Sequence, residues 1–292
     1  MLISENAHAK INLTLDILGK RPDGYHELRT VYQSLALCDT LRFLPSPDGS
    51  ITLGCDVPGI PLSDDNLAIR AARMLGSHYG VTKGVHIELV KRIPMAAGLA
   101  GGSSDAAAAL RGLVRFWQLP HEKDVLNALA ARLGSDVPFC LAGGTAIGTG
   151  RGEQVTALPS CPHFYVVLSN PGFAVSTAEV YQAYRVKENK MHPDTDGLVR
   201  AIINTDQKGI MGRLANVLES ATFMLYPAVS KLKERMAGEG ASLMCGSGPT
   251  VFALFKNQQQ AGRLVDSLQA EGAAAWLTET YAGDDKGVNT DV

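Results

Sequence analysis

The first third of the chain alternates between apolar and polar residues, which is the pattern of β-strands with one buried face. In residues 9–18 the apolar positions fall on one face and the polar positions on the other. The apolar face consists of Ile11, Leu13, Leu15 and Ile17. Two further strand regions are predicted, over residues 27–44 after the turn residues 20–24, and over residues 85–93.

Apolar residues spaced three and four apart predict helices in three segments of the first half. The first segment begins with Ser and Asp residues that can cap a helix, and it ends at Gly80. The second follows a run of glycines and has Leu110, Leu113, Val114 and Trp117 on its apolar face. The first and third of these helices are predicted over residues 63–80 and 122–134.

The second half mixes short strands and helices without the regular strand–helix–strand order of a parallel sheet. Strands are predicted over residues 164–170, over 241–255 as two strands about a tight turn, and over 273–279. Helices are predicted over residues 176–184, 228–240 and 257–272, a polar loop over 186–196, and a frayed tail over 283–292. We therefore predict the α+β class with two domains, residues 1–150 and 151–292.

Composition places the chain among folded proteins, because 46% of its 292 residues are hydrophobic and 19% are charged. The formal net charge of -2 gives no global attraction to nucleic acid or to an acidic membrane surface. The five cysteines are odd in number and scattered, which argues against a disulfide framework or a zinc site.

The N-terminal residues lack the basic and apolar regions of a signal peptide, and no run of about 20 apolar residues occurs. We therefore expect a cytoplasmic protein without a membrane span. Nothing in the sequence bears on the oligomeric state.

The segment Pro94–Ser104, "PMAAGLAGGSS", is the most unusual stretch, and we call it the glycine loop. It directly precedes an alanine-rich helix, whose first N–H groups have no partner and carry partial positive charge. Glycines let such a backbone approach a ligand closely, so the loop can bind phosphate. A loop that needs glycine only for close packing remains an alternative. The segment is not a Walker A motif, because no Lys-Ser or Lys-Thr follows the glycines.

Four other features permit both a structural and a functional interpretation. Lys10 interrupts an apolar strand and either reaches solvent or pairs with an anion. Asp136 either caps a turn or accepts a hydroxyl proton at a cleft. Tyr25 and His26 are either simply exposed or grip a flat base. Cys245–Thr250, "CGSGPT", which we call the glycine turn, either joins two strands or closes the far side of a pocket.

Together these segments resemble the GHMP kinase family of small-molecule kinases, whose phosphate loop in such members reads Pro-x-x-x-Gly-Leu-x-x-x-Ser-Ser. The blocks "AKINLTLDILGKRPDGYHEL", "LGSDVPFCLAGGTAIGTGRGE" and "GSGPTVFALF" extend the resemblance over residues 5–255. The first block is similar to members that act on a small substrate carrying a cytidine diphosphate group, in the non-mevalonate route to isoprenoids. The resemblance implies an N-terminal domain like the second domain of ribosomal protein S5, a ferredoxin-like C-terminal domain, and an active site in the cleft between them.

The resemblance also implies residue roles. Asp136 takes the proton from the attacking hydroxyl while Lys10 holds and polarises it. Asn12, Tyr25, His26 and Tyr181 contact the substrate. ATP is the phosphoryl donor, and Mg²⁺ accompanies it with Ser103 or Ser104 as a ligand, whereas no carboxylate ligand can be named. The residues that bind ATP are Pro94, Met95, Ala96, Ala97, Gly98, Leu99, Ala100, Gly101, Gly102, Ser103 and Ser104.

Two alternatives and one departure accompany this hypothesis. The acceptor could instead be mevalonate, homoserine or a sugar, although the rings of Tyr25 and His26 favour a nucleotide base. A non-catalytic relative that only binds ligands is the second alternative. The family loop often has glycine where this chain has Ala100, and a methyl group is tolerable there if φ is negative.

Overall fold

The computed structural model describes residues 3–184 and 192–283. A seven-stranded sheet forms the larger half, in the order β3-β4-β2-β1-β8, with β5 pairing β2 and β6. Its strands are β1 (Ile3–Lys20), β2 (His26–Ser46), β3 (Ile51–Cys55), β4 (Gly84–Val90), β5 (Thr145–Gly150), β6 (Gln154–Ala157) and β8 (Ala215–Asn216). The three predicted strand regions of the first third are confirmed.

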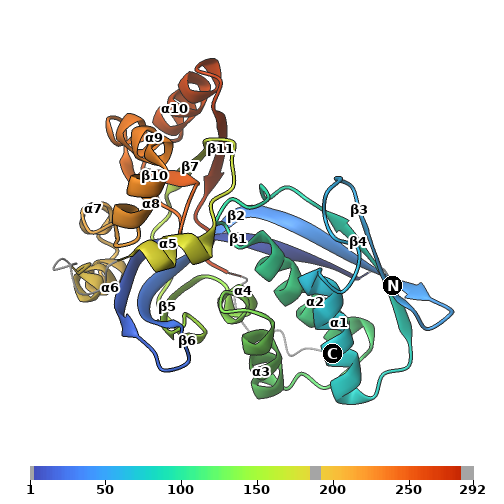
Figure 1. Cartoon of the computed structure of the whole chain (residues 1–292). Coiled ribbons are helices and arrows are strands. Elements are labelled where there is room, and N and C mark those ends of the chain that lie inside the picture. Colours follow the sequence, from blue (N-terminus) through green and yellow to red (C-terminus); the bar gives the residue numbers. More distant parts are fainter. Residues whose placement is uncertain (1–2, 185–191, 284–292) are drawn as a thin grey trace.

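The long antiparallel ribbon of β1 and β2 crosses the whole molecule (Figure 1). Its period of two separates two faces, as the sequence predicts. Ile11, Leu13 and Ile17 are fully buried on the apolar face. Lys10 and Asn12 on the opposite face are also nearly inaccessible, so polar groups of β1 are enclosed too. The ladder with β2 shifts register between His8 and Lys10 and again between Asn12 and Thr14, and such irregularities often re-aim side chains next to active sites.

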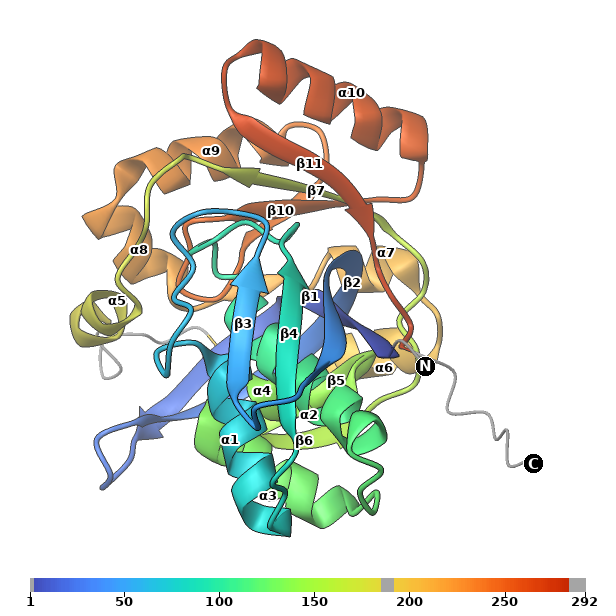
Figure 2. The same cartoon turned by 90° about the vertical axis from the view of Figure 1, so that its right-hand side faces the viewer.

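Four helices lie on one side of the larger sheet, and the third of them packs mainly on the other three (Figure 2). They are α1 (Leu67–Tyr79), α2 (Gly101–Phe116), α3 (Lys123–Leu133) and α4 (Val137–Ala142). The apolar stripe predicted for α2 is buried against Phe43 and Leu75 in one core. Helix α1 ends at Gly80, whose φ of 65° is left-handed, as a glycine stop requires. The helices α1, α2 and α3 are thus confirmed, although Asn66 rather than a Ser or Asp residue caps α1.

A second, four-stranded antiparallel sheet has the order β11-β7-β10-β9. Its strands are β7 (Tyr165–Asn170), β9 (Ala241–Met244), β10 (Val251–Phe255) and β11 (Ala274–Glu279). The helices α9 (Pro227–Ala237) and α10 (Gln258–Ala270) pack on it, and α5 (Thr177–Ala183) lies over the β1–β2 ribbon (Figure 1). All of these strands and helices are confirmed predictions.

The segment between the two glycine motifs held elements that the periodicity did not reveal. They are α4, β5, β6 and β8 together with α6 (Thr195–Ile203), α7 (Gln207–Met211) and α8 (Glu219–Leu225), of which α6 and α7 are capped by the side chains of Asp194 and Asp206. Part of the predicted loop 186–196, residues 186–191, lies outside the described residues, and Thr195 and Asp196 already belong to α6. The predicted tail lies outside them from residue 284 onward.

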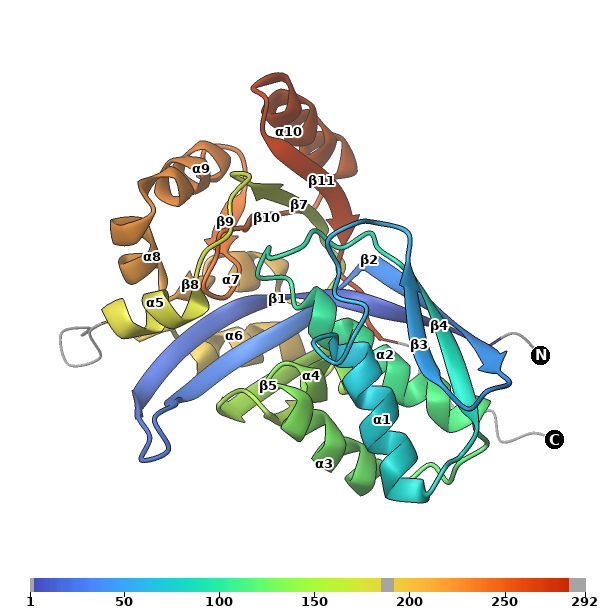
Figure 3. The same ribbon diagram turned by 45° about the vertical axis from the view of Figure 1, so that its right-hand side comes forward.

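The two sheets share a core, because Ile11 and Leu13 of β1 pack in one cluster with Leu168 of β7 and Phe252 of β10. Figure 3 shows the smaller sheet above the ribbon and the helices of the larger sheet below it. The domain boundary near residue 150 stays a prediction, and the strands that flank it, β5 and β6, pair with each other. No helix in the described part of the chain is long and apolar enough to cross a bilayer.

Candidate active site

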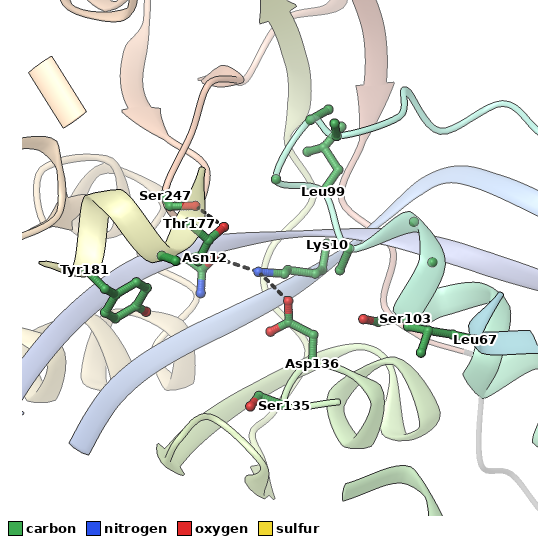
Figure 4. Close-up of a pocket in the computed structure, with 18 of the residues that line it drawn as sticks. Lys10, Asn12, Leu67, Leu99, Ser103, Ser135, Asp136, Thr177, Tyr181 and Ser247 are labelled. Carbon is green, nitrogen blue, oxygen red and sulfur yellow. Dashed lines mark hydrogen bonds and ion pairs between the residues drawn. The ribbon is translucent and has the colours of Figure 1, made fainter. Parts of the chain in front are cut away.

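A cavity of about 1540 Å³ lies along the polar face of β1. Elements from both halves of the chain enclose it: the glycine loop and the start of α2, the N-terminal end of α4, helix α5 and the glycine turn (Figure 4). The candidate residues that line it are Lys10, Asn12, Tyr25, His26, the glycine loop from Pro94 to Ser103, Asp136 and Tyr181. Ser104 is not among the described residues that line it.

Lys10 and Asp136, 126 residues apart in sequence, meet in this cavity. The Lys10 Nζ lies 3.4 Å from Asp136 Oδ2, and Figure 4 shows the two side chains pointing toward each other. Lys10 Nζ also donates to Asn12 Oδ1 over 3.0 Å. The Asn12 amide is oriented by its donation to Thr30 Oγ1 over 2.7 Å. The ammonium group is therefore held in place by both an amide oxygen and a carboxylate.

Asp136 stands at the N-terminal end of α4 without serving that helix as a cap. Its carboxylate makes no capping hydrogen bond with the described backbone. Proline at the second position, Pro138, is compatible with a helix start because no partner is needed there for its missing N–H. The carboxylate is about one-third exposed, at 34%, and it turns toward the cavity. Asp136 thus occupies the turn and N-cap position that its structural interpretation predicts, but its side chain does not cap the helix and faces the cavity.

The glycine loop exposes backbone to the cavity. Ala96, Gly98 and Ala100 have φ values of 50°, 74° and 59°, all in the left-handed region. Alternate left-handed residues turn successive N–H groups into one concavity that suits anions. The loop passes directly into α2, whose N-cap residue Ala100 makes no side-chain capping bond. The partial positive charge of this helix end therefore faces the cavity.

Ala100 does not meet the condition under which its methyl group is tolerated without strain. Its φ is +59°, whereas the sequence argument requires a negative value. An L-residue in this conformation costs roughly 1–2 kcal/mol relative to glycine. The loop keeps its shape because surrounding contacts hold it.

Two of these contacts join the loop to β1. The Lys10 backbone N–H donates to Leu99 O over 3.1 Å. The hydroxyl of Ser104 donates to His8 O over 2.6 Å, so this serine binds the strand rather than the cavity. The hydroxyl of Ser103, in contrast, is drawn on the cavity side of α2 (Figure 4).

The glycine turn supports the loop from the smaller sheet. A Cβ on Gly98 would lie 2.8 Å from Gly248 O and 2.9 Å from Cys245 O, so only glycine fits this approach. Gly246 and Ser247 line the cavity, and the Ser247 hydroxyl lies 2.9 Å from that of Thr177 on α5. Thus the turn does more than connect two strands, since it closes the far side of the cavity as its functional interpretation predicts.

A buried ionic cluster lies at the base of the loop. Lys91 Nζ donates to Asp39 and, over 2.9 Å, to Asp105 Oδ2 in the first turns of α2. Asp39 also accepts the backbone N–H of Ile93 over 2.8 Å. A Cβ on Gly101 would lie 3.3 Å from Lys91 Nζ, so the ammonium packs directly against the start of the helix. Burial, opposed by Lys91, raises the pKa of Asp105 to about 7.

Aromatic residues gather at the opposite end of the cavity. The rings of His26 and Tyr181 are 5.2 Å apart, and the guanidinium of Arg151 lies 4.9 Å from the ring centre of Tyr25. Partial burial, together with Lys20, lowers the pKa of His26, so its imidazole is neutral near pH 7 and has both a donor and an acceptor. Burial also raises the pKa of the Tyr181 hydroxyl, which keeps its proton.

Comparison with known proteins gives this arrangement a family. Two family models match, described as "GHMP kinases N terminal domain" over residues 66–144 and "GHMP kinases C terminal" over residues 198–274. The chain is 46% identical over 271 residues to 4-diphosphocytidyl-2-C-methyl-D-erythritol kinase of Geobacillus sp. strain WCH70, covering 92% of this chain and 93% of that protein. The corresponding kinase of Bacillus subtilis is 44% identical over the same shares of both chains. The chain belongs to the 4-diphosphocytidyl-2-C-methyl-D-erythritol kinase family of GHMP kinases.

Solved structures agree with this GHMP kinase assignment. A crystal structure of 4-(cytidine 5'-diphospho)-2C-methyl-D-erythritol kinase matches with a TM-score of 0.82 and 35% identity, covering 96% of this chain and 100% of that one. A homoserine kinase from Cytophaga hutchinsonii matches with a TM-score of 0.75, covering 96% of this chain and 95% of that one, but at 18% identity it supports only the fold. The α+β, two-domain GHMP kinase fold is thereby established.

Several residues of this GHMP kinase site were missed by sequence reasoning. They are Tyr32 beneath Asp136, the cluster of Asp39, Lys91 and Asp105, the cation Arg151, and the hydroxyls of Thr177 and Ser247. The charges of the cluster had a signal, since Asp39 and Lys91 each interrupt an apolar run and charged residues are seldom buried unless paired.

Proposed function

We propose that the protein is an ATP-dependent kinase of the non-mevalonate route to isoprenoid precursors. It transfers the γ-phosphoryl group of ATP to the 2-hydroxyl of 4-diphosphocytidyl-2-C-methyl-D-erythritol, giving ADP and the 2-phosphate product. The observation that carries the proposal is the Lys10–Asp136 pair, which lies in one cavity with a glycine loop on one side and aromatic rings on the other. Such phosphoryl transfer depends mainly on positioning and on charge stabilisation.

Asp136 acts as the general base and Lys10 as its partner. With the acceptor hydroxyl within hydrogen-bond reach of both groups, Asp136 Oδ2 accepts the hydroxyl proton while the oxygen attacks the γ-phosphorus. The ammonium of Lys10 stabilises the negative charge that grows on this oxygen. The hydrogen bond from Lys10 Nζ to Asn12 Oδ1 keeps the ammonium aimed at the same point. These two groups thus orient the nucleophile and remove its proton.

Residues 94–103 of the glycine loop bind the ATP phosphates, while the Ser104 hydroxyl donates to His8 O of β1. Backbone N–H groups and the positive end of α2 supply the attraction, because the loop has few side chains that could obstruct a phosphate. Within residues 3–184 and 192–283 no group of three His, Cys, Asp or Glu side chains is arranged to hold a metal ion. Mg²⁺ fits this site as an ion carried by the phosphates and its own waters, with the Ser103 hydroxyl as the available protein ligand. When bound, it neutralises phosphate charge.

The aromatic end binds the cytidine group of the substrate. Tyr25 and Tyr181 offer ring faces for a pyrimidine base, and the neutral imidazole of His26 offers both a donor and an acceptor for its polar edge. A small alcohol such as homoserine or mevalonate would leave these rings without a ligand. For this reason the cytidyl substrate is preferred over the other acceptors of GHMP kinases.

The acceptor is tested by measuring ADP release with ATP and a panel of alcohols. We expect turnover with 4-diphosphocytidyl-2-C-methyl-D-erythritol and background rates with mevalonate, homoserine and galactose. Activity on one of these three and none on the cytidyl substrate would refute the assignment. Binding of the cytidyl substrate without ADP release would instead favour a non-catalytic relative.

The base is tested with Asp136→Ala. General-base removal costs roughly 10²–10⁴-fold in rate. We expect at least a hundredfold fall in kcat and an ATP dissociation constant within about threefold of wild type, because within the described residues the Asp136 carboxylate pairs with Lys10 and Tyr32 and not with the glycine loop. Wild-type turnover in this variant would exclude Asp136 as the base.

A further inference from the structure

Tyr32 of β2 lies directly beneath the carboxylate of Asp136. Its hydroxyl donates to Asp136 Oδ1 over 3.3 Å, while Lys10 Nζ lies 3.4 Å from Oδ2. Each carboxylate oxygen therefore has its own partner. Two partners on different oxygens fix the rotation of a carboxylate, which a single partner does not.

The Tyr32 ring is itself locked in place. It stacks on Phe139 of α4, with ring centres 4.7 Å apart, so the ring rests on the helix that begins at Asp136. A Cβ on Gly148 would lie 2.5 Å from the ring carbon Cε2, and a Cβ on Gly152 would collide with the hydroxyl oxygen. Two glycines of the β5–β6 hairpin thus make room for this ring. The ring therefore has limited freedom, and its hydroxyl, besides lying 3.3 Å from Asp136 Oδ1, lies 3.5 Å from a second acceptor, Gly152 O.

The surroundings of the Asp136 carboxylate keep the Tyr32 hydroxyl protonated, so it remains a hydrogen-bond donor. The groups that face Asp136 are Lys10 from β1, Tyr32 from β2, Cys140 from α4 and Tyr181 from α5. Burial first, and then the negative charge of Asp136, raise the pKa of Tyr32 well above 10. The hydroxyl therefore keeps its proton throughout the range in which a kinase works. The Lys10 ammonium lies over the ring, 5.3 Å from its centre, in a cation–π contact.

We propose that Tyr32 is a positioning residue for proton transfer, which holds the Asp136 carboxylate so that Oδ2 faces Lys10 and the acceptor hydroxyl. This inference rests on the proposed role of Asp136 as the base. The Tyr32 hydrogen bond to Oδ1 stabilises the charged carboxylate and keeps it ready to accept a proton. The proton moves to Oδ2 and the hydroxyl of Tyr32 stays protonated.

The test is Tyr32→Phe, which removes the hydroxyl and keeps the ring on Phe139. We expect kcat to fall roughly tenfold, with KM for ATP and for the cytidyl substrate unchanged within about twofold. The acid limb of the kcat/KM profile should move to higher pH by about 0.5–1 unit, because the carboxylate loses a donor to its charged form. A merely structural effect would not move this limb.

Tyr79→Phe is the matched control. The Tyr79 hydroxyl at the end of α1 is buried and has no hydrogen-bond partner among the described residues, and Tyr79 does not line the cavity. We expect wild-type kinetics and an unchanged pH profile from this variant.

A second readout does not depend on how well Tyr32→Phe folds. Site-specific replacement of Tyr32 by 3-fluorotyrosine keeps the hydroxyl but makes it a stronger donor, so the acid limb should move to lower pH. An unchanged profile in both Tyr32 replacements, or a shift in the same direction in both, would overturn the proposal.

Asp136→Asn separates this failure from failure of the proposed function. If Asp136→Asn abolishes turnover while both Tyr32 replacements behave as wild type, then Asp136 is the base and Tyr32 does not position it. If Asp136→Asn retains turnover, the base assignment and this inference both fail. In the Asp136→Asn background, Tyr32→Phe should cause no further loss of residual activity.

Discussion

Replacing Lys91 with methionine tests the buried cluster at the base of the glycine loop. The side chains of Lys91, Asp39 and Asp105 are 6%, 0% and 5% exposed, so solvent cannot compensate for a lost charge. Lys91→Met fills a similar volume but leaves two buried carboxylates facing each other. Breaking a buried ion pair by removing one partner costs about 3–5 kcal/mol. In this variant two carboxylates lose the same ammonium partner, and protonation of one of them removes much of the repulsion between them.

The loss in the free energy of unfolding caused by Lys91→Met should therefore depend on pH. The pKa of Asp105 is about 7 even with Lys91 present, and the loss of the cation raises it further. At pH 6 Asp105 binds a proton and much of the repulsion disappears. Between pH 6 and pH 8 the folded variant holds a proton that the unfolded chain has released, so its free energy of unfolding falls by about 1.4 kcal/mol per pH unit. We expect a loss in the free energy of unfolding of about 4 kcal/mol at pH 8 and about 2 kcal/mol at pH 6.

The assay is equilibrium unfolding in urea at both pH values, with KM for ATP measured on the folded variant. Because the ammonium packs against Gly101, we expect KM for ATP to rise while KM for the cytidyl substrate is unchanged. Lys256→Met, at an exposed lysine, is the control and should change stability by less than about 0.5 kcal/mol. A loss below 1 kcal/mol at pH 8, or an equal loss at both pH values, would refute the reasoning.

Three further substitutions probe the same loop. Gly98→Ala places a methyl group against the carbonyls of Gly248 and Cys245 at a φ of 74°, so it should cost about 2–4 kcal/mol in urea unfolding and raise KM for ATP. Ala100→Gly relieves a left-handed alanine at φ 59° and should raise the thermal midpoint, by a net gain of up to about 1 kcal/mol. Asp105→Asn removes a carboxyl group whose pKa of about 7 exceeds its usual 3.8. Because the pKa is raised in the folded state, the free energy of unfolding of wild type falls as pH rises from about 4 to about 7. Wild type should therefore lose stability relative to Asp105→Asn across this range, and parallel curves of stability against pH would contradict this.

Much of the fold followed from local patterns. The period of two in residues 9–18 predicted both the strand and its two faces, and it placed Lys10 and Asn12 together on the face that lines the cavity. Gly80 as a helix stop and the run of glycines before α2 were likewise visible, because backbone conformations that need glycine are local.

The missed features depend on contacts between distant positions. Tyr32 and Asp136 are separated by 104 residues, and an aromatic residue inside a strand region reads as ordinary core. Likewise α6, α7 and α8 depend on tertiary packing and, in α6 and α7, on the side-chain caps Asp194 and Asp206, more than on an apolar stripe of their own. The positive φ of Ala100 is a tertiary effect of the same kind.

The attachment of the glycine loop to both sheets has a consequence for how ligands come and go. Leu99 is bonded to Lys10 of β1, and Gly98 rests against the carbonyls of Cys245 and Gly248 beside the smaller sheet. A hinge motion that separated the two sheets would break these contacts and disrupt the glycine loop in every catalytic cycle. We therefore expect the two sheets to stay together during the catalytic cycle. Substrate and products then exchange past the exposed side chain of Tyr25 at the tip of the β1–β2 ribbon.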